Sequence, residues 1–309
     1  MSPERKADSL RNDDKDSKGK SGFIGRVGAV NEAGVRAGVV RVAIQGERGS
    51  NSHMAALEVT GGMAEIRGCA LSAEVFEAVE AGAVEIAVLP IENSLHGSVA
   101  EHYDLLLKHK VKVSGEMMLR IRHNVIGAPG VRLKDVRRVM SHPVALSQCR
   151  EWLRMHPEIE VVPFYDTAGS VKDLMARGAR DVAGIAPELA AKEYGASVIV
   201  AGIEDHAENF TRFYVLEKAD GAGETDADKM SVAFSVAHRP GTLIGALEVF
   251  RDAGINLTKV ESRPVHGRVW EYVFFVDVRF ESEAQVDGAL LRLGGMCQMV
   301  KELGRYRAA

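Results

Sequence analysis

The chain of 309 residues contains only three cysteines, Cys69, Cys149 and Cys297. They lie far apart, their number is odd and no Cys-x-x-Cys motif occurs, so we expect a reducing compartment and no disulfide framework. No apolar run approaches the roughly 20 residues that a membrane-spanning helix needs. Residues 1–20 carry mixed charges without an apolar segment, which argues against a secretory signal. The sequence therefore predicts a cytoplasmic protein with no membrane contact.

An excess of charge of one sign is also lacking. Lys and Arg number 39 against 43 Asp and Glu, which gives a formal net charge of −4. Such a chain has no basic field for nucleic acid, so no nucleic-acid partner is expected. The Gly-rich motifs that bind nucleotide phosphates are absent as well. His96 and His102 have no Cys or carboxylate at metal-ligand spacing, so we expect neither a metal nor a cofactor.

The composition is that of a globular protein with several domains. Hydrophobic residues make up 46% and charged residues 27% of the chain, which is ordinary for such a protein. Residues 1–39 are rich in Ser, Asp, Lys and Gly, and we predict a disordered tail there. Residues 219–229 are mostly small or acidic, which is typical of a linker. This divides the rest into one domain at 40–218 and another at 230–305.

Strand and helix patterns alternate through the first of these domains. Short apolar runs of strand length lie at residues 39–44, 86–89, 138–140, 161–164 and 181–185. Helical patterns fall between them, for example at residues 97–109, 145–155 and 168–176. Alternation of this kind favours an α/β fold with largely parallel sheets.

The second domain follows the order strand, helix, strand, strand, helix, strand. This βαββαβ order is typical of a ferredoxin-like fold. Its strand at residues 269–280 is apolar on both faces, with Phe274 on one and Phe275 on the other. One face would lie on helices and the other on a second subunit, so we predict a homodimer or homotetramer.

Polar residues gather just after the strands of the first domain, where open α/β sheets bind ligands. The loop at 90–99 contains Glu92, Asn93 and Ser94, and it leads into a helix whose N-terminus would favour an anion. The segment 141–149 contains Ser141 near a helix start and Gln148 further along it. A turn followed by a helix cap explains each of these loops equally well.

Two more segments have the same character. The segment 166–170 contains Thr167 and Gly169, whose hydroxyl and backbone N–H groups suit a carboxylate or an ordinary N-cap. Thr211, Arg212 and Phe213 open a strongly apolar strand, where they offer a hydroxyl donor and a cation. A strand with alternating polar residues is the simpler interpretation of this last segment.

Taken together and in this order, these segments resemble the prephenate dehydratase family. The resemblance covers residues 40–218 and runs through 46–49, 90–99, 141–149, 166–169, 185–195 and 211–213. It implies a two-lobed catalytic domain of the periplasmic-binding-protein type. It also implies a reaction in which prephenate loses its ring hydroxyl and a carboxylate to give phenylpyruvate, CO₂ and water, without a cofactor.

The resemblance assigns roles to individual residues. It implies the catalytic residues Thr211, Asn93, Ser141, Gln148 and Glu92. It implies the substrate-binding residues Arg212, Phe213, Ser94, Thr167 and Gly169. In this scheme Thr211 donates a hydrogen bond to the departing hydroxyl, and Arg212 pairs with a carboxylate of the substrate.

Residues 230–305 resemble the ACT domain that usually accompanies this enzyme. Gly245, Ala246 and Leu247 stand where that family has an effector loop, and Glu261, Ser262, Arg263 and Pro264 match a second motif of the family. The resemblance implies an allosteric site for L-phenylalanine and feedback control of phenylalanine biosynthesis. Removing residues from Asp220 onward would then leave activity and abolish sensitivity to phenylalanine.

Three alternatives remain to be compared with this interpretation. Arogenate is the rival substrate, because Asn51 stands where the family usually has an aromatic residue and Gln45-Gly46 replaces the common Gly-Pro. A non-catalytic amino-acid sensor could be built from the same two folds, but it would not need Thr211. Fusion to a chorismate mutase is not expected, because the residues before the first strand are too few and too polar for that helical domain.

Overall fold

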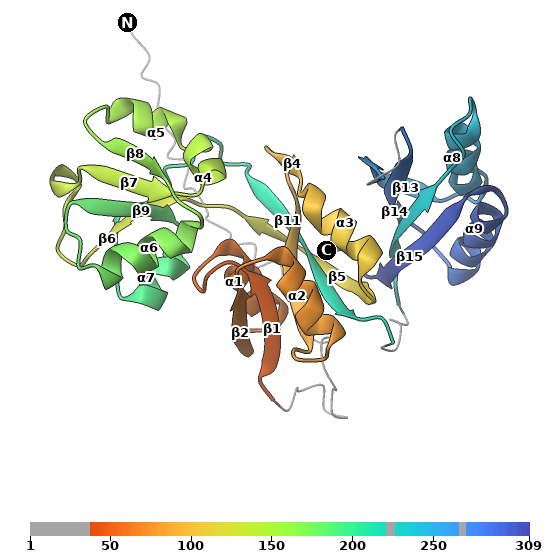
Figure 1. Cartoon of the computed structure of the whole chain (residues 1–309), viewed down its shortest axis with the longest axis horizontal. Helices are drawn as coiled ribbons and strands as arrows, with labels where there is room; N and C mark the ends of the chain where they lie inside the picture. The colour runs from red at the N-terminus through yellow and green to blue at the C-terminus, as the bar shows by residue number, and fades with distance from the viewer. Residues whose placement is uncertain (1–37, 221–225, 266–269) are drawn as a thin grey trace, which may run out of the picture.

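The structure is a computed structural model that describes residues 38–220, 226–265 and 270–309. The predicted tail lies almost wholly outside the described residues, as does part of the predicted linker. Three units follow one another along the long axis of the molecule (Figure 1). A central lobe lies between an outer lobe and the C-terminal domain, which is blue in the figure. Among the described residues, no helix has the length and hydropathy to span a bilayer.

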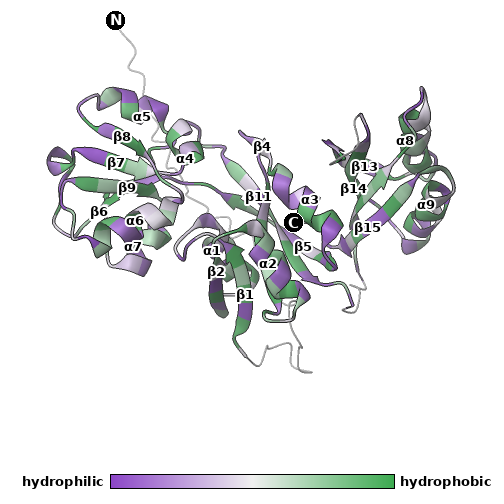
Figure 2. Cartoon of the chain, in the orientation of Figure 1, coloured by the Kyte–Doolittle hydropathy of each residue, from purple (hydrophilic) through white to green (hydrophobic). Residues whose placement is uncertain are grey.

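The central lobe is built on one mixed sheet in the order β2-β1-β3-β11-β5, with the short β4 paired to β3. Its strands are β1 (Val40–Gln45), β2 (Ala64–Cys69), β3 (Ile86–Asn93), β4 (Gly97–Ser98), β5 (Val111–Arg120) and β11 (Phe210–Lys218). Its helices are α1 (Asn51–Val59), α2 (Ser72–Glu80) and α3 (Ala100–Lys108). Apolar and polar segments alternate along α2 and α3 (Figure 2), as expected of helices that lie on a sheet.

The outer lobe has a second sheet, in the order β10-β6-β9-β7-β8. Its strands are β6 (Asn124–Gly127), β7 (Arg138–Ser141), β8 (Glu160–Pro163), β9 (Val182–Ala186) and β10 (Ser197–Val200). Its helices are α4 (Pro143–Ser147), α5 (Arg150–Met155), α6 (Thr167–Ala176) and α7 (Glu188–Tyr194). The predicted two-lobed α/β fold is confirmed. The sheets are mixed rather than largely parallel, because only β2-β1-β3 and β8-β7-β9 pair in parallel.

The chain crosses between the two lobes twice, after β5 and before β11. The backbone N–H of Ile121 donates to the carbonyl of Asn209 at 2.7 Å, and that of Ile203 donates to the carbonyl of His123 at 2.9 Å. These bonds tie the outgoing segment to the returning one. The lobes are therefore joined by a paired crossing, as in two-lobed ligand-binding folds, and a cleft lies between them.

Local sequence explains the helix starts that face this cleft. Ser50 is the N-cap of α1, and its hydroxyl accepts a hydrogen bond from the backbone N–H of His53. Asp166 is the N-cap of α6, and its carboxylate accepts one from Gly169 at 2.7 Å. Both residues come from the short polar side chains that favour this position. Each cap directs a helix N-terminus toward the space between the lobes.

The C-terminal domain has the predicted βαββαβ order. Its elements are β12 (Lys229–Ser235), α8 (Thr242–Asp252), β13 (Asn256–Pro264), β14 (Tyr272–Arg279), α9 (Glu283–Met296) and β15 (Met299–Tyr306). One sheet face packs on its own helices. The other packs on the central lobe of the same chain, where Phe275 contacts Tyr103 edge-on with ring centroids 4.9 Å apart. The apolar second face that suggested a partner subunit is thus covered within the chain.

The backbones of the ACT domain and the central lobe come close together in the contact between these two domains. A Cβ added at Gly304 of β15 would lie 2.0 Å from the carbonyl oxygen of Val113 in β5. Gly304→Ala is therefore expected to force the two domains apart and to lower the free energy of unfolding by about 1–3 kcal/mol. The matched control is Gly294→Ala in α9, where the added methyl meets nothing within 4 Å and should stabilise the helix by roughly 0.5–1 kcal/mol. Thermal melting measures both; equal melting temperatures would contradict the close approach.

Candidate active site

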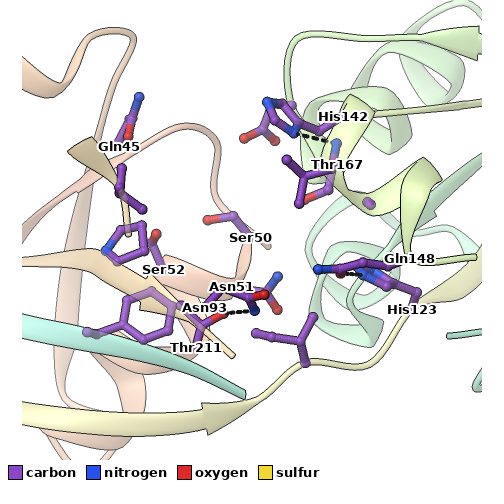
Figure 3. A pocket seen from close by; sticks show the side chains of 17 residues that line it. Gln45, Ser50, Asn51, Ser52, Asn93, His123, His142, Gln148, Thr167 and Thr211 are labelled. Carbon is purple, nitrogen blue, oxygen red and sulfur yellow. Dashed lines mark hydrogen bonds between the residues drawn. The ribbon is translucent and has the colours of Figure 1, made fainter. Parts of the chain in front are cut away.

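A cavity of about 270 Å³ lies between the central and outer lobes. Figure 3 shows side chains from both lobes pointing into it. The lining residues are Gln45, Ser50, Asn51, Ser52, Pro90, Asn93, Val99, Ile121, His123, His142, Val144, Ala145, Gln148, Asp166, Thr167, Thr211 and Phe213. Five residues to which the sequence assigned roles are among them: Asn93, Gln148, Thr167, Thr211 and Phe213. The structure thus brings together segments that are up to 168 residues apart in the chain.

Asn93 and Thr211 form a pair on neighbouring strands, as Figure 3 shows. The amide oxygen of Asn93 accepts the backbone N–H groups of Leu95 and His96, each at 3.0 Å. Its amide nitrogen is thereby turned toward Asn209 and Thr211, and it donates to the amide oxygen of Asn209 at 2.8 Å and to the hydroxyl oxygen of Thr211 at 3.0 Å. Because that oxygen accepts from Asn93, the hydroxyl proton remains available. No acceptor from the described residues takes it, so Thr211 can donate to a ligand in the cavity.

Gln148 lies at the centre of a second network, on the far side of the cavity. Its amide oxygen accepts from the amide nitrogen of Asn209 at 2.9 Å and is 2.7 Å from Nε2 of His123. His123 therefore carries its proton on Nε2. Burial lowers the pKa of His123, which favours the neutral ring. The amide nitrogen of Gln148 is 3.1 Å from Nδ1 of His96 in the central lobe, so this network bridges the cleft.

The electrostatics of the cavity come from dipoles rather than from fixed cations. Among the described residues, no Lys or Arg lines it. The N-termini of α1 and α6 reach it from opposite lobes, and each carries a partial positive charge that favours an anion. Burial raises the pKa of Asp166, although the backbone N–H of Gly169 opposes that shift. The N-terminus of α1 would match a carboxylate of a ligand, whereas at α6 the carboxylate of Asp166 already caps the helix.

Several residues that the sequence singled out lie elsewhere. Ser141 is fully buried, and its hydroxyl donates to the carbonyl of Ile185 at 2.6 Å. Ser94 accepts from the backbone of Phe210 at 3.0 Å, beside the cavity rather than in its lining. Gly169 contributes its N–H to the cap of α6. None of the three lines the cavity, so their contacts support the walls of the site.

Glu92 and Arg212 point to the opposite face of the sheet from Asn93 and Thr211. Arg212 donates to Glu116 at 2.7 Å and to Asp277 of the C-terminal domain at 2.5 Å. Glu92 pairs with Lys259 of the same domain at 2.9 Å. Successive strand residues face opposite sides, so Thr211 and Arg212 cannot both face the cavity.

Three further residues had no sequence pattern strong enough to assign them a role: His123 and His142 line the cavity, and Asn209 lies outside its lining. His123 lies in the crossing between the lobes, after the end of β5 at Arg120 and directly before β6, and outside the segments to which the sequence assigned roles. His142 is the N-cap of the short helix α4, and its side chain accepts a hydrogen bond from the backbone N–H of Val144. Asn209 is fully buried one residue before β11 and donates to Gln148. The one sequence feature that could have marked Asn209 as a candidate is its position two residues before Thr211.

Comparisons with known proteins agree with this geometry. A family model for prephenate dehydratase matches residues 42–221, and a model for the ACT domain matches residues 230–294. A bifunctional chorismate mutase/prephenate dehydratase of Aquifex aeolicus is 38% identical over 272 residues, 87% of this chain and 74% of that protein. Arogenate dehydratase/prephenate dehydratase 2 of Arabidopsis thaliana is 40% identical over 279 residues, 86% of this chain and 72% of that protein.

Two solved structures have the same architecture. Prephenate dehydratase of Arthrobacter aurescens in complex with L-Phe is 30% identical, with a TM-score of 0.80 over 87% of this chain and 90% of that chain. GqqA, described as a novel type of quorum quenching acylase, is also 30% identical, with a TM-score of 0.80 over 87% of this chain and 98% of that chain. Since the first family model spans more than half of the sequence, the chain belongs to the prephenate dehydratase family and carries a C-terminal ACT domain.

Proposed function

We propose that the chain catalyses the decarboxylating dehydration of prephenate to phenylpyruvate, CO₂ and water in phenylalanine biosynthesis. The single observation that carries this proposal is the Asn93–Thr211 pair, whose free hydroxyl proton faces a cavity enclosed by both lobes. In the reaction the bond from the ring to its carboxylate breaks, and its electron pair enters the ring. The bond from the ring to its hydroxyl breaks in turn, and the ring becomes aromatic. The oxygen leaves as hydroxide, which a hydrogen bond stabilises as the bond breaks and which then takes up a proton from solvent to give water.

Thr211 would supply that hydrogen bond. A threonine hydroxyl is a weak acid, so its role is a positioned donor rather than full proton transfer. The hydrogen bond that Thr211 accepts from Asn93 polarises its own O–H group and strengthens it as a donor. Gln148 and Thr167 would contact the remaining polar groups of the substrate from the outer lobe. The N-terminus of α1 would hold one of its carboxylates.

Incubating the purified protein with prephenate and, separately, with arogenate tests this proposal. Phenylpyruvate from prephenate is the expected product, and the absence of turnover with both substrates would refute the proposal. Arogenate is the second candidate substrate, because the Arabidopsis relative has both names and because Gln45 and Asn51 line the cavity. A higher kcat/KM for arogenate, with phenylalanine as the product, would decide for that alternative.

We further propose that L-phenylalanine regulates the enzyme through a cavity of about 230 Å³ in the ACT domain. Gly241, which is the N-cap of α8, and the first residues of that helix, Thr242 to Ile244, line this cavity together with Trp270 and Tyr272. The predicted Gly245, Ala246 and Leu247 follow directly in α8, and Ala246 is buried in the domain core rather than in the cavity lining.

The second predicted motif lies on another part of the ACT domain. Glu261 accepts a hydrogen bond from Ser98 of the central lobe at 2.6 Å, and Arg263 pairs with Asp104 there at 3.0 Å. Ser262 and Pro264 are exposed on the other face of β13. Their proposed contact with phenylalanine would involve the ACT domain of a second subunit, in a cytoplasmic homodimer or homotetramer. Sedimentation of the protein with and without phenylalanine tests that assembly.

Trp270→Ala is expected to weaken phenylalanine binding at least about tenfold, because a large aromatic side chain at a binding site contributes on the order of 2 kcal/mol. Calorimetry with L-phenylalanine measures this directly. Leu291→Ala is the matched control, since Leu291 is also a large exposed apolar residue of the ACT domain but does not line the cavity. Equal phenylalanine affinities of the two variants would exclude the proposed cavity.

A further inference from the structure

Strands β3 and β11 carry the candidate catalytic pair on one face and a pair of charged residues on the other. Thr211 lies opposite Asn93 in the ladder, and Arg212 lies opposite Glu92. Neighbouring residues of a strand share a peptide unit but face opposite sides of the sheet. A displacement of the backbone at Glu92 or Arg212 therefore also moves the neighbouring residue, Asn93 or Thr211.

Both charged residues contact the ACT domain. Glu92 accepts from the ammonium group of Lys259 in β13 at 2.9 Å. Arg212 donates to Asp277 in β14 at 2.5 Å. Within the central lobe, Arg212 also donates to Glu116 at 2.7 Å. The ACT domain thus contacts both strands directly behind the candidate catalytic residues.

In the contact between the central lobe and the ACT domain, the charged groups around Arg212 are buried and each has a partner of opposite charge. Glu116, Arg212, Lys229 and Asp277 are each at most 8% exposed. Lys229 of the ACT domain donates to Glu116 at 2.8 Å, so two positive and two negative charges alternate across the interface. Buried ion pairs cost desolvation and often stabilise no more than apolar packing, but they require one defined geometry. Such a cluster therefore determines the orientation of the ACT domain on the central lobe more than it stabilises the contact between them.

We propose that Glu92 and Arg212 are positioning residues, through which the ACT domain sets the geometry of Asn93 and Thr211. This inference rests on the proposed function. A shift of the ACT sheet would move the two charged side chains, and the shared backbone would alter the 3.0 Å contact between Asn93 and Thr211. A misplacement of about 1 Å in a catalytic group can cost roughly 10²-fold in rate. Domain movement can therefore control the rate without any ACT residue entering the cavity.

Lys259→Met tests the proposal, because it keeps the apolar stem of the side chain and removes only the ammonium group. We expect kcat for prephenate to fall at least about fivefold with KM within about twofold, in line with coupling energies of 1–3 kcal/mol. Lys259→Arg keeps the charge and should restore kcat. The response to saturating phenylalanine should weaken in Lys259→Met, while calorimetry still detects phenylalanine binding.

Lys301→Met is the matched control. Lys301 also crosses from the ACT domain to the central lobe, but its ammonium group donates to the carbonyls of Leu106, Leu107 and His109 at the end of α3. Its loss should leave kcat within about twofold of wild type. Equal losses of kcat in both variants, or none in either, would overturn the proposal.

Glu92→Gln extends the test to the other side of the pair. If Glu92 and Lys259 act as one unit, the double variant should be no worse than the poorer single variant. Fully additive losses would overturn the proposal and would also show that a fall in kcat came from instability or from the other contacts of Lys259. A wild-type protein that does not turn over prephenate would instead refute the proposed function, so the two failures are distinguishable.

Discussion

Thr211→Ala is expected to lower kcat for prephenate by about two orders of magnitude or more, because it removes the only O–H group of the Asn93–Thr211 pair. A positioned donor to a departing group contributes roughly 10²–10⁴-fold. Thr211 is 8% exposed at the cavity surface, so loss of its hydroxyl and methyl groups leaves a small gap rather than a core cavity. We therefore expect little change in the melting temperature.

Thr211→Ser is the control, because it keeps the hydroxyl and removes only a methyl group. Its kcat should stay within about tenfold of wild type, which corresponds to about 1.4 kcal/mol. Steady-state kinetics and thermal melting of both variants are sufficient measurements. An alanine variant within about threefold of wild type would remove Thr211 from the mechanism, and Asn93 or Gln148 would have to provide the donor instead.

The fold could be predicted largely from sequence because each domain has a clear order of strand and helix patterns. The orientation of Arg212 could not. Residues 211–216 of β11 are all buried, since the sheet has the cavity and α1 on one side and the ACT domain on the other. A strand buried on both faces lacks the polar–apolar alternation that reveals which side a residue faces. The carboxylate partner predicted for Arg212 is therefore supplied by the protein, from Glu116 and Asp277.

Gln148 illustrates a similar limit in the outer lobe. The sequence predicts one helix over residues 145–155, but the structure divides it into α4 and α5, with Gln148 and Cys149 between them. This break turns the amide of Gln148 toward His123 and Asn209. The interaction that holds it there joins residues 61 positions apart. Local periodicity carries no information on such a contact, whereas the position of Gln148 after a strand was enough to mark it as a candidate.

Deleting residues 220–309 is expected to abolish the activity along with the phenylalanine response, contrary to the expectation from sequence alone. The ACT domain covers a continuous apolar surface of the central lobe, where Tyr103, Val113 and Leu216 share one core with Phe275 and Leu303. Each large apolar side chain that becomes exposed costs about 1.5–3 kcal/mol. Several such losses match the whole stability of a typical domain, about 5–15 kcal/mol.

The deletion also removes the charged partners of the central lobe. Glu116 of β5 loses its partner Lys229, and Arg212, which is on the same strand as Thr211, loses its partner Asp277. The truncated protein should therefore be poorly soluble, bind a hydrophobic dye and show less than about 1% of wild-type kcat, since each lost buried pair costs about 3–5 kcal/mol. Full-length Trp270→Ala is the control that should weaken phenylalanine binding but keep the fold. A soluble truncated protein with wild-type kcat would contradict this expectation. It would show that the two catalytic lobes keep the geometry of the active site without the ACT domain.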